Sequence, residues 1–277
     1  MSVPRRQVFE NIISLPDAEI PLAEAALLVA CEEYPHLALN SYLNQLDQMA
    51  NDVRAYQKVG DTQFDTLTKI NRVLFKDYGF SGNTANYYDP RNSFLNDVIE
   101  RRLGIPITLS AIYIEVARRL HLQVDGVGLP GHFMLKHRSD DQDIFIDSFN
   151  GGILMTREEC LEFVTRTHGA DKVNAKQFMN GVSTRQIVSR MLRNLKMIYI
   201  EAEAFEKALV MVELMVLTDS TEELLYRDRG LLRLHLRQFD GAIRDLKRYV
   251  RTRPLAEDRK NIEKYLKELY RLRVMMN

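Results

Sequence analysis

The sequence predicts a mainly helical α+β fold, with a small antiparallel sheet in the middle of the chain and paired helices after it. Three observations predict this class. Apolar residues recur at three-to-four spacing over the first third. A strongly apolar helix is then followed by three short strand-like segments, and the last third contains a helical repeat. This order lacks the repeated strand–helix alternation of a doubly wound sheet.

The first third predicts three helices that pack on one another. Asp61 is expected to cap the third helix, which ends before Gly79. Cys31 falls in the first helix, where a buried structural thiol is expected. The predicted ranges are Pro21–Glu33, Leu39–Gln57 and a helix from Asp61 that carries Phe64, Leu67, Ile70, Val73 and Leu74.

The middle of the chain begins after turn signals at Ser81-Gly82-Asn83 and Asp89-Pro90. A short helix is predicted at Asn92–Arg102, followed by a break at Gly104-Ile105-Pro106. The next helix, Ile107–Leu120, is apolar over more than one stripe. Such a helix is expected to be buried at the centre of the fold.

Three strands are predicted after the central helix, at Gln123–Val127, His132–His137 and Asp143–Phe149. The polar stretch 138–142 predicts a hairpin between the last two. Asn150-Gly151-Gly152 closes the third strand with residues suited to positive φ.

The C-terminal third repeats with a period of 34 residues. Phe205-x-x-Ala208-Leu209 recurs as Phe239-x-x-Ala242-Ile243, which is typical of tetratricopeptide helical hairpins. The first unit is degenerate, because Lys196 stands where the second has Gly230. A terminal helix is expected at Asn261–Val274. The predicted organisation is therefore N-terminal helices (1–80), an α+β core (81–182) and helical repeats (183–277).

Composition excludes several function classes. Lys plus Arg and Asp plus Glu both number 38, so the chain has no net charge. Its overall charge therefore does not point to nucleic acid or an anionic membrane as the main partner. No apolar run reaches the length of a membrane span or a signal peptide. The two distant cysteines, Cys31 and Cys160, form neither a disulfide framework nor a zinc pair. These features predict a reduced, cytoplasmic protein.

No cofactor or metal site is predicted. The sequence has neither a phosphate-binding Walker motif nor a Rossmann glycine pattern. His132 and His137 are five residues apart, so in a regular strand they face opposite sides and cannot share a metal ion.

His132 and Asp147 are the candidate catalytic residues. They lie on strands predicted to pair, where residues on one face come close enough for a carboxylate to orient an imidazole. An imidazole held in this way can act as a general base or as the partner of a nucleophile. The alternative is a histidine whose hydrogen bond to the aspartate is purely structural.

Three motifs around this pair resemble a bacterial transglutaminase-like family with a transglutaminase core, papain-like in character. Members carry C-terminal tetratricopeptide repeats, and one largely uncharacterised group is described as invasion-regulator-like. The resemblance covers most of the chain and implies a transglutaminase-like core. The motifs are the run from Asn92 to Ser110, Gly128-x-Pro130-Gly131-His132-Phe133, and Phe145-Ile146-Asp147-x-Phe149-x-Gly151-Gly152.

The resemblance implies a catalytic triad in which a Cys opens the central helix, and His132 and Asp147 match the other two members. The cysteine would fall within Ile105–Thr108, which reads Ile-Pro-Ile-Thr. The nearest hydroxyls, on Ser93, Thr108 and Ser110, are the remaining nucleophile candidates. A hydroxyl has a much higher pKa than a thiol and needs an aligned base and an oxyanion hole.

The leading hypothesis is a regulatory or protein-interaction protein without the catalytic cysteine, which binds a protein or peptide partner in the former substrate cleft. His132 and Asp147 would anchor the partner, and Asn92, Asn96 and Pro130 would contribute to binding. The alternative is an amide or ester hydrolase or an acyltransferase that uses His132 and Asp147 with a hydroxyl or an activated water. The sequence leaves the oligomeric state and the pathway open.

Overall fold

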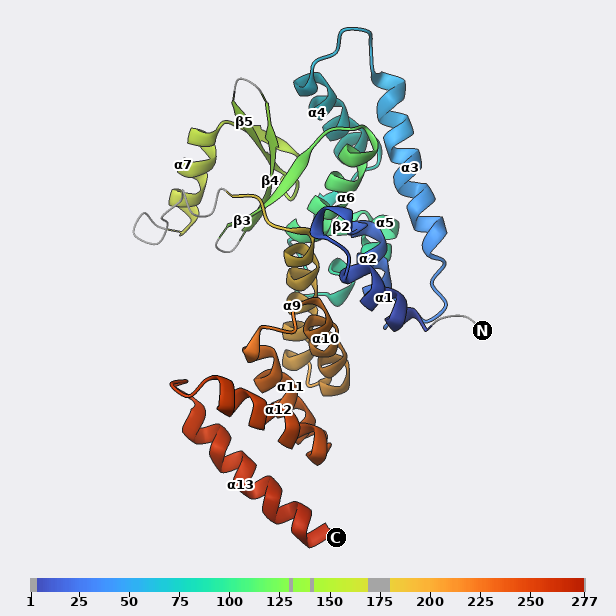
Figure 1. Cartoon of the computed structure of the whole chain (residues 1–277). Coiled ribbons are helices and arrows are strands. Elements are labelled where there is room, and N and C mark those ends of the chain that lie inside the picture. Colours follow the sequence, from blue (N-terminus) through green and yellow to red (C-terminus); the bar gives the residue numbers. More distant parts are fainter. Residues whose placement is uncertain (1–3, 130–131, 140–141, 169–179, 277) are drawn as a thin grey trace. The chain divides into compact units, whose positions relative to one another are not determined.

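The computed structural model describes residues 4–129, 132–139, 142–168 and 180–276 of the chain (Figure 1). The chain divides into two compact units, 1–191 and 192–277. The boundary between them falls within one helix, α9 (Thr184–Glu201). The fold is α+β and mainly helical, as predicted.

The first unit has helices in the three regions where the sequence predicts them, preceded by α1, which was not predicted. The cap of α4 differs from the prediction: Thr62 accepts a hydrogen bond from the backbone N–H of Asp65, whereas Asp61 accepts from Lys58 and pairs with Lys69. The carboxylate of Asp61 therefore binds Lys58 before the helix and Lys69 within it, and it does not cap the first turn. The helices are α1 (Arg5–Ile13), α2 (Leu22–Ala30), α3 (Leu39–Tyr56) and α4 (Gln63–Asn71), which continues as a π-helical segment (Arg72–Asp77).

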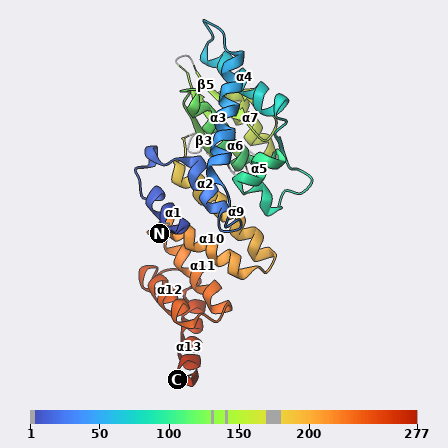
Figure 2. The ribbon, with the colours of Figure 1, turned by 90° about the vertical axis from the view of Figure 1, so that its right-hand side faces the viewer.

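The expected buried central helix is confirmed as α6 (Pro106–Arg119), in which every residue from Pro106 to Ala117 is buried. Pro106 occupies the first turn, where its missing N–H costs no hydrogen bond. The helix packs against α2 and α3, and Figure 2 shows α3 running alongside it. The shorter α5 (Leu95–Arg101) precedes it and ends at Arg102, whose left-handed φ of 61° stops the helix.

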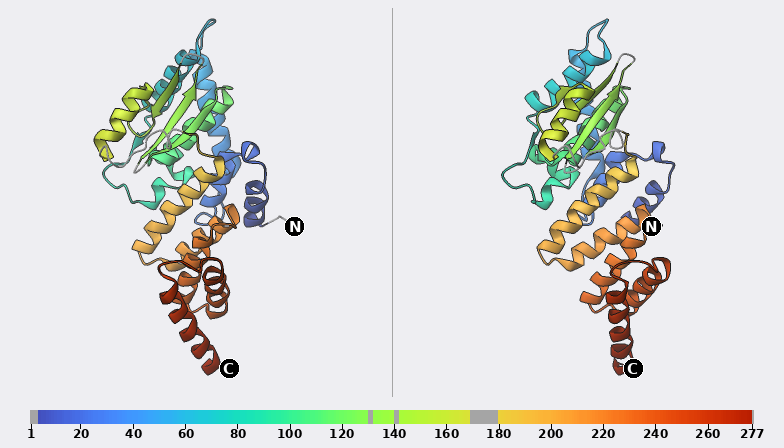
Figure 3. Two further views of the ribbon diagram at one scale, coloured as in Figure 1. Left: turned by 60° about the vertical axis from the view of Figure 1, so that its left-hand side comes forward. Right: turned by 90° about the vertical axis from the view of Figure 1, so that its left-hand side faces the viewer.

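The sheet is antiparallel and has the order β3-β4-β5-β6. Side chains alternate between its two faces, and α6 packs on one face while α7 (Arg157–His168) packs on the other (Figures 1 and 3). The strands are β3 (Val124–Leu129), β4 (His132–Arg138), β5 (Asp143–Asp147) and β6 (Ile153–Met155).

The third predicted strand is shorter than expected, and β6 was not predicted. Strand β5 ends at Asp147 because its carboxylate accepts hydrogen bonds from the backbone N–H groups of Phe149 and Asn150, which turn the chain. Gly151 and Gly152 then take φ values of 76° and 77°, as predicted. The chain returns as β6, which at three residues is too short to show alternation.

The second unit consists of tetratricopeptide-type helical hairpins and a terminal helix. Gly230 lies where α11 and α12 approach closely, since a Cβ there would sit 2.7 Å from Leu246. The small residue at this contact is thus required by packing. The helices are the C-terminal part of α9, α10 (Phe205–Thr218), α11 (Glu223–His235), α12 (Phe239–Thr252) and α13 (Arg259–Met276).

Candidate functional site

Strand pairing brings His132 and Asp147 to one face of the sheet. His132 is the first residue of β4, where it pairs with Leu129 of β3, and Asp147 is the last residue of β5. Leu129 and Met134 belong to a buried cluster with Cys160 of α7. The His–Asp pair therefore lies on the α7 side of the sheet, and not on the side that α6 covers.

The two side chains are in contact. Nε2 of His132 lies 3.1 Å from Oδ2 of Asp147. The orientation of the ring does not give a well-aligned hydrogen bond, and this buried nitrogen has no other partner among the described residues. The pair is thus close enough for electrostatic coupling, with the imidazole held near the carboxylate.

Asp147 is held by its own turn. Its Oδ1 accepts the backbone N–H groups of Phe149 and Asn150, and its Oδ2 accepts the side-chain amide of Asn150 at 2.7 Å. Burial by itself would raise the pKa of this carboxyl, but the neighbouring His132 and the Asn150 hydrogen bonds outweigh burial and lower it. Asp147 is therefore an anion that is fixed in direction.

Aromatic rings pack against the imidazole. The ring centroid of His132 lies 5.5 Å from that of Phe163 on α7 and 6.3 Å from that of Phe149. The His132 side chain is only 11% exposed. Helix α7 and the turn after β5 thus restrict access to the ring.

A cleft of about 720 Å³ opens beside Asp147, between the end of the sheet and α7. Its wall combines apolar side chains with three carboxylates and one guanidinium, so its charge is mainly negative. The lining residues are Asp147, Asn150, Ile153, Leu154, Met155, Glu159, Glu162, Phe163 and Arg166.

The hydroxyl of Thr108 is engaged at the start of α6. Its Oγ1 accepts the backbone N–H of Ile105 and lies 2.7 Å from the carbonyl oxygen of Asn92, to which it donates. The side chain is fully buried. These bonds fasten the first turn of α6 to the segment before α5.

Ser110 lies on the opposite side of the sheet from His132. Its Oγ is 2.8 Å from Oγ of Ser148, and both residues are fully buried. Ser148 follows Asp147, so its side chain points to the α6 face. Ser93 is buried as well, and its hydroxyl has no partner among the described residues.

Neither cysteine opens α6. Cys31 lies at the end of α2 and accepts a hydrogen bond from Arg5, while Cys160 is on α7 and is fully buried against Met134. Burial, together with the charge of Asp147, raises the pKa of the Cys160 thiol to about 11. A thiol in this setting stays protonated near neutral pH.

The predicted binding residues of the first motif lie inside the protein. Asn92 is fully buried, accepts a hydrogen bond from Asn83 and donates to the carbonyls of Asn86 and Tyr87. Asn96 is buried on α5, and its Oδ1 has no partner among the described residues. Pro130 lies outside the described residues.

The cleft residues of α7 were missed by sequence reasoning. Glu162, Phe163 and Arg166 belong to an amphipathic helix without a recognisable motif. Only their place next to Asp147 identifies them, and this place depends on how α7 packs on the sheet.

His137 faces the other side of the sheet from His132. Both of its ring nitrogens are hydrogen-bonded, to the carbonyl of Gln123 and the side chain of Gln63. Within the described ranges, no three His, Cys, Asp or Glu side chains are placed to hold a metal ion. None of the described helices has the length and apolar character to cross a membrane.

Two sequence families match the chain. The pattern of the transglutaminase-like superfamily matches residues 40–193, and that of the tetratricopeptide repeat matches residues 195–267. Together they cover the sheet, α6 and α7 on the one hand and the helical hairpins on the other.

Relatives of the chain occur in bacteria and in the mouse, and they cover different shares of it. A UPF0162 protein of Xylella fastidiosa (strain Temecula1) is 36% identical over 270 residues, which cover 96% of both chains. A UPF0162 protein of Vibrio cholerae is 28% identical over 181 residues, covering 65% of this chain and 66% of the relative. Mouse F-box only protein 21 is 33% identical over 143 residues, 49% of this chain but only 22% of the mouse protein.

Proposed function

Because the chain belongs to the transglutaminase-like superfamily and carries tetratricopeptide repeats, we propose that it acts as a regulatory protein-interaction protein. Its first unit binds a peptide segment of a partner in the cleft beside Asp147. The superfamily fold supplies the cleft, and no covalent thiol chemistry takes place there.

The lining of the cleft is the observation that supports this proposal. None of its described lining residues is a serine, threonine or cysteine, so none of them offers a hydroxyl or thiol nucleophile beside Asp147. The hydroxyls of Thr108 and Ser110 are used in buried hydrogen bonds. An acyl-transfer enzyme needs a nucleophile within hydrogen-bond reach of its base.

The cysteines support the same conclusion. A catalytic thiol is exposed to its substrate and has a lowered pKa. Cys160 is on the His132 side of the sheet, but it is fully buried and its pKa is raised to about 11. Its packing in the apolar cluster under α7 accounts for its position.

The cleft favours an extended peptide with apolar and basic side chains. Strand β6 is an edge strand, and Ile153 on it is 53% exposed. An extended peptide can pair with such an edge and place alternate side chains in a neighbouring pocket. Asp147, Glu159 and Glu162 would attract a lysine or arginine of that peptide.

The proposal includes a cytoplasmic location. Both cysteines are free thiols, buried in separate parts of the first unit. Unpaired cysteines of this kind are typical of proteins that work in a reducing compartment.

Quantitative affinity capture with cleft variants tests the proposal. Glu162→Ala removes a charge from the lining of the cleft, and His132→Ala removes the ring that packs against Phe163 in its wall, so each should reduce recovery of the same partner by about tenfold. Glu158→Ala is the matched control, because Glu158 is exposed on the same helix but does not line the cleft. The partner is then confirmed by calorimetry with the purified proteins. If all three variants capture it equally, the cleft is not the binding site.

The rival function is hydrolysis of an amide or ester by a water that His132 activates. The contact between Nε2 of His132 and the anionic Asp147 favours it, since a carboxylate at this distance can hold the imidazole in a fixed orientation. Turnover of a panel of chromogenic esters and amides distinguishes the two functions. Hydrolysis that His132→Ala abolishes and Glu158→Ala preserves would establish the enzyme and overturn the binding proposal.

A further inference from the structure

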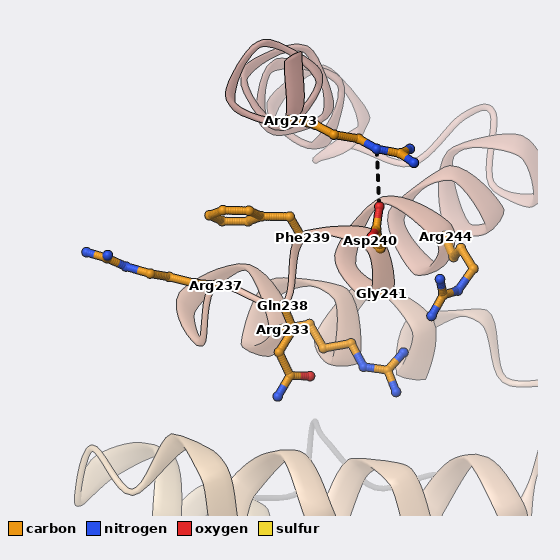
Figure 4. A pocket seen from close by; sticks show the side chains of 8 residues that line it. All are labelled: Arg233, Arg237, Gln238, Phe239, Asp240, Gly241, Arg244 and Arg273. Carbon is orange, nitrogen blue, oxygen red and sulfur yellow. Dashed lines mark ion pairs between the residues drawn. The ribbon is translucent and has the colours of Figure 1, made fainter. Parts of the chain in front are cut away.

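The second unit contains an arginine-lined hollow that the proposed function does not use. The hollow has a volume of about 550 Å³ and lies around the start of α12. Four of its lining residues are arginines and only one is acidic. They are Arg233, Arg237, Gln238, Phe239, Asp240, Gly241, Arg244 and Arg273 (Figure 4).

Two of these arginines are already engaged. Arg233 binds Asp245 and Glu213 at 2.7 and 2.8 Å and is only 17% exposed, so it forms part of the scaffold. Arg273 of α13 pairs with Asp240 of α12 at 3.3 Å. Both members of this second pair are mostly exposed, and an exposed pair of this kind contributes little to stability.

The other two arginines have no ion-pair or hydrogen-bond partner among the described residues. Arg237 and Arg244 are exposed on either side of the first turn of α12. In a chain with no net charge, this is a local excess of positive charge. Such an excess attracts anions, and guanidinium groups bind carboxylates through paired hydrogen bonds.

The directions of these side chains indicate the kind of anion. Figure 4 shows Arg237 and Arg244 extending away from each other, while Arg273 reaches Asp240 from another helix. The three guanidinium groups do not converge on one point, so a single phosphate cannot meet all of them. An extended chain with several carboxylates can meet each one separately.

Two further features suit a peptide. The backbone N–H groups of the first turn of α12 have no helical acceptor, and Gln238 provides no side-chain cap. The aromatic ring of Phe239 lies in the wall of the hollow and can contact an apolar side chain. A carboxylate next to the start of α12 also gains from the helix dipole.

We propose that this hollow is a docking site for an acidic peptide segment of a partner protein. Carboxylates of the segment bind Arg237 and Arg244, and a third displaces Asp240 from Arg273. The site belongs to the second unit alone, and it would stand even if the cleft beside Asp147 proved not to bind peptide.

Fluorescence anisotropy with the full-length protein tests the proposal. The probe is a labelled peptide of about ten residues that contains Asp, Glu and one Leu. Arg237→Ala/Arg244→Ala should weaken its binding about tenfold, because two charge-assisted contacts are lost. The matched control is Arg251→Ala/Arg253→Ala, which removes the same charge from exposed positions outside the hollow.

A second variant should change the affinity for the peptide in the opposite direction. Asp240→Asn removes the carboxylate that competes for Arg273 and should tighten peptide binding roughly two- to threefold. Binding should also weaken as KCl rises from about 50 mM to about 500 mM. Circular dichroism verifies that each variant is folded.

Other results would overturn the proposal. These are equal binding of an Asn/Gln version of the peptide, equal weakening by the two double variants, and weaker binding by Asp240→Asn. Inorganic phosphate and the unlabelled acidic peptide are then compared as competitors of the labelled probe. If phosphate displaces the probe at concentrations at which the unlabelled peptide does not, the hollow is a phosphate site instead.

Discussion

The contact between His132 and Asp147 is the central feature at the scale of single residues. Asp147 accepts three hydrogen bonds from its own turn, so its position does not depend on His132. His132 in contrast relies on the carboxylate and on two aromatic rings. The aspartate is thus the fixed member of the pair and the histidine is the dependent one.

Asp147→Asn should destabilise the protein at neutral pH by about 1–3 kcal/mol, because a buried charged acceptor is lost. The folded state holds the pKa of Asp147 below its ordinary value, which is about 3.9 in an unfolded chain. The ionised group therefore adds stability above that value, and the addition is lost as the pH falls through the lower, folded-state pKa.

Urea denaturation from about pH 7 down to about pH 3 measures this dependence. The difference between wild type and Asp147→Asn should shrink toward the acid end. Glu158→Gln, at an exposed position of α7, serves as the control and should change stability little. A difference that is constant across this range would mean that the charge of Asp147 is not what stabilises the turn.

At the scale of elements, the two helices that flank the sheet have different roles. Helix α6 is the buried support of the first unit, and its polar side chains are used for fastening. Thr108 fixes its first turn to Asn92, and Ser110 fixes its middle to Ser148. Helix α7 carries four of the nine residues that line the cleft.

The Ser110–Ser148 contact gives a prediction that can be checked by a double-mutant cycle. Ser110→Ala and Ser148→Ala should each cost about 1–3 kcal/mol, because each leaves a buried hydroxyl without its partner. The double variant should cost less than the sum of the two, since it leaves no unpaired hydroxyl. Thermal or urea unfolding measures all three. Additive losses would show that the hydroxyls do not interact.

At the scale of the whole molecule, each of the two units buries apolar residues of its own. In the first unit one buried cluster lies on the α7 face of the sheet, and in the second unit another joins α12 and α13. The division between the units falls inside α9. Each unit is compact by itself, so a substitution in the core of one unit is expected to change the stability of that unit.

Unfolding of the full-length protein should therefore proceed in two steps. Gly230→Val places side-chain atoms where a Cβ alone would already lie 2.7 Å from Leu246, and should cost the second unit about 1–3 kcal/mol. Asp147→Asn should lower the temperature at which the first unit unfolds. Calorimetry with both variants measures this. If each substitution shifted a single common transition, the two units would unfold as one.

Local signals in the sequence determined most of the fold. The apolar periodicity of Ile107–Leu120 predicted the buried central helix, and the spacing from Phe205 to Phe239 predicted the tetratricopeptide hairpins. Asn150-Gly151-Gly152 predicted the positive φ values after the last predicted strand. These features depend on residues close together in the chain, so patterns of a few residues carry them.

Tertiary structure alone decided the composition of the site. From the sequence we paired His132 with Asp147 and expected their nucleophile at the start of the central helix. In the structure, the alternation of side chains along β4 and β5 places both residues on the face of the sheet that α7 covers. It also could not show that the hydroxyl of Ser110 is used by Ser148, 38 residues away. Contacts between distant residues depend on register and helix packing, and no local pattern records these.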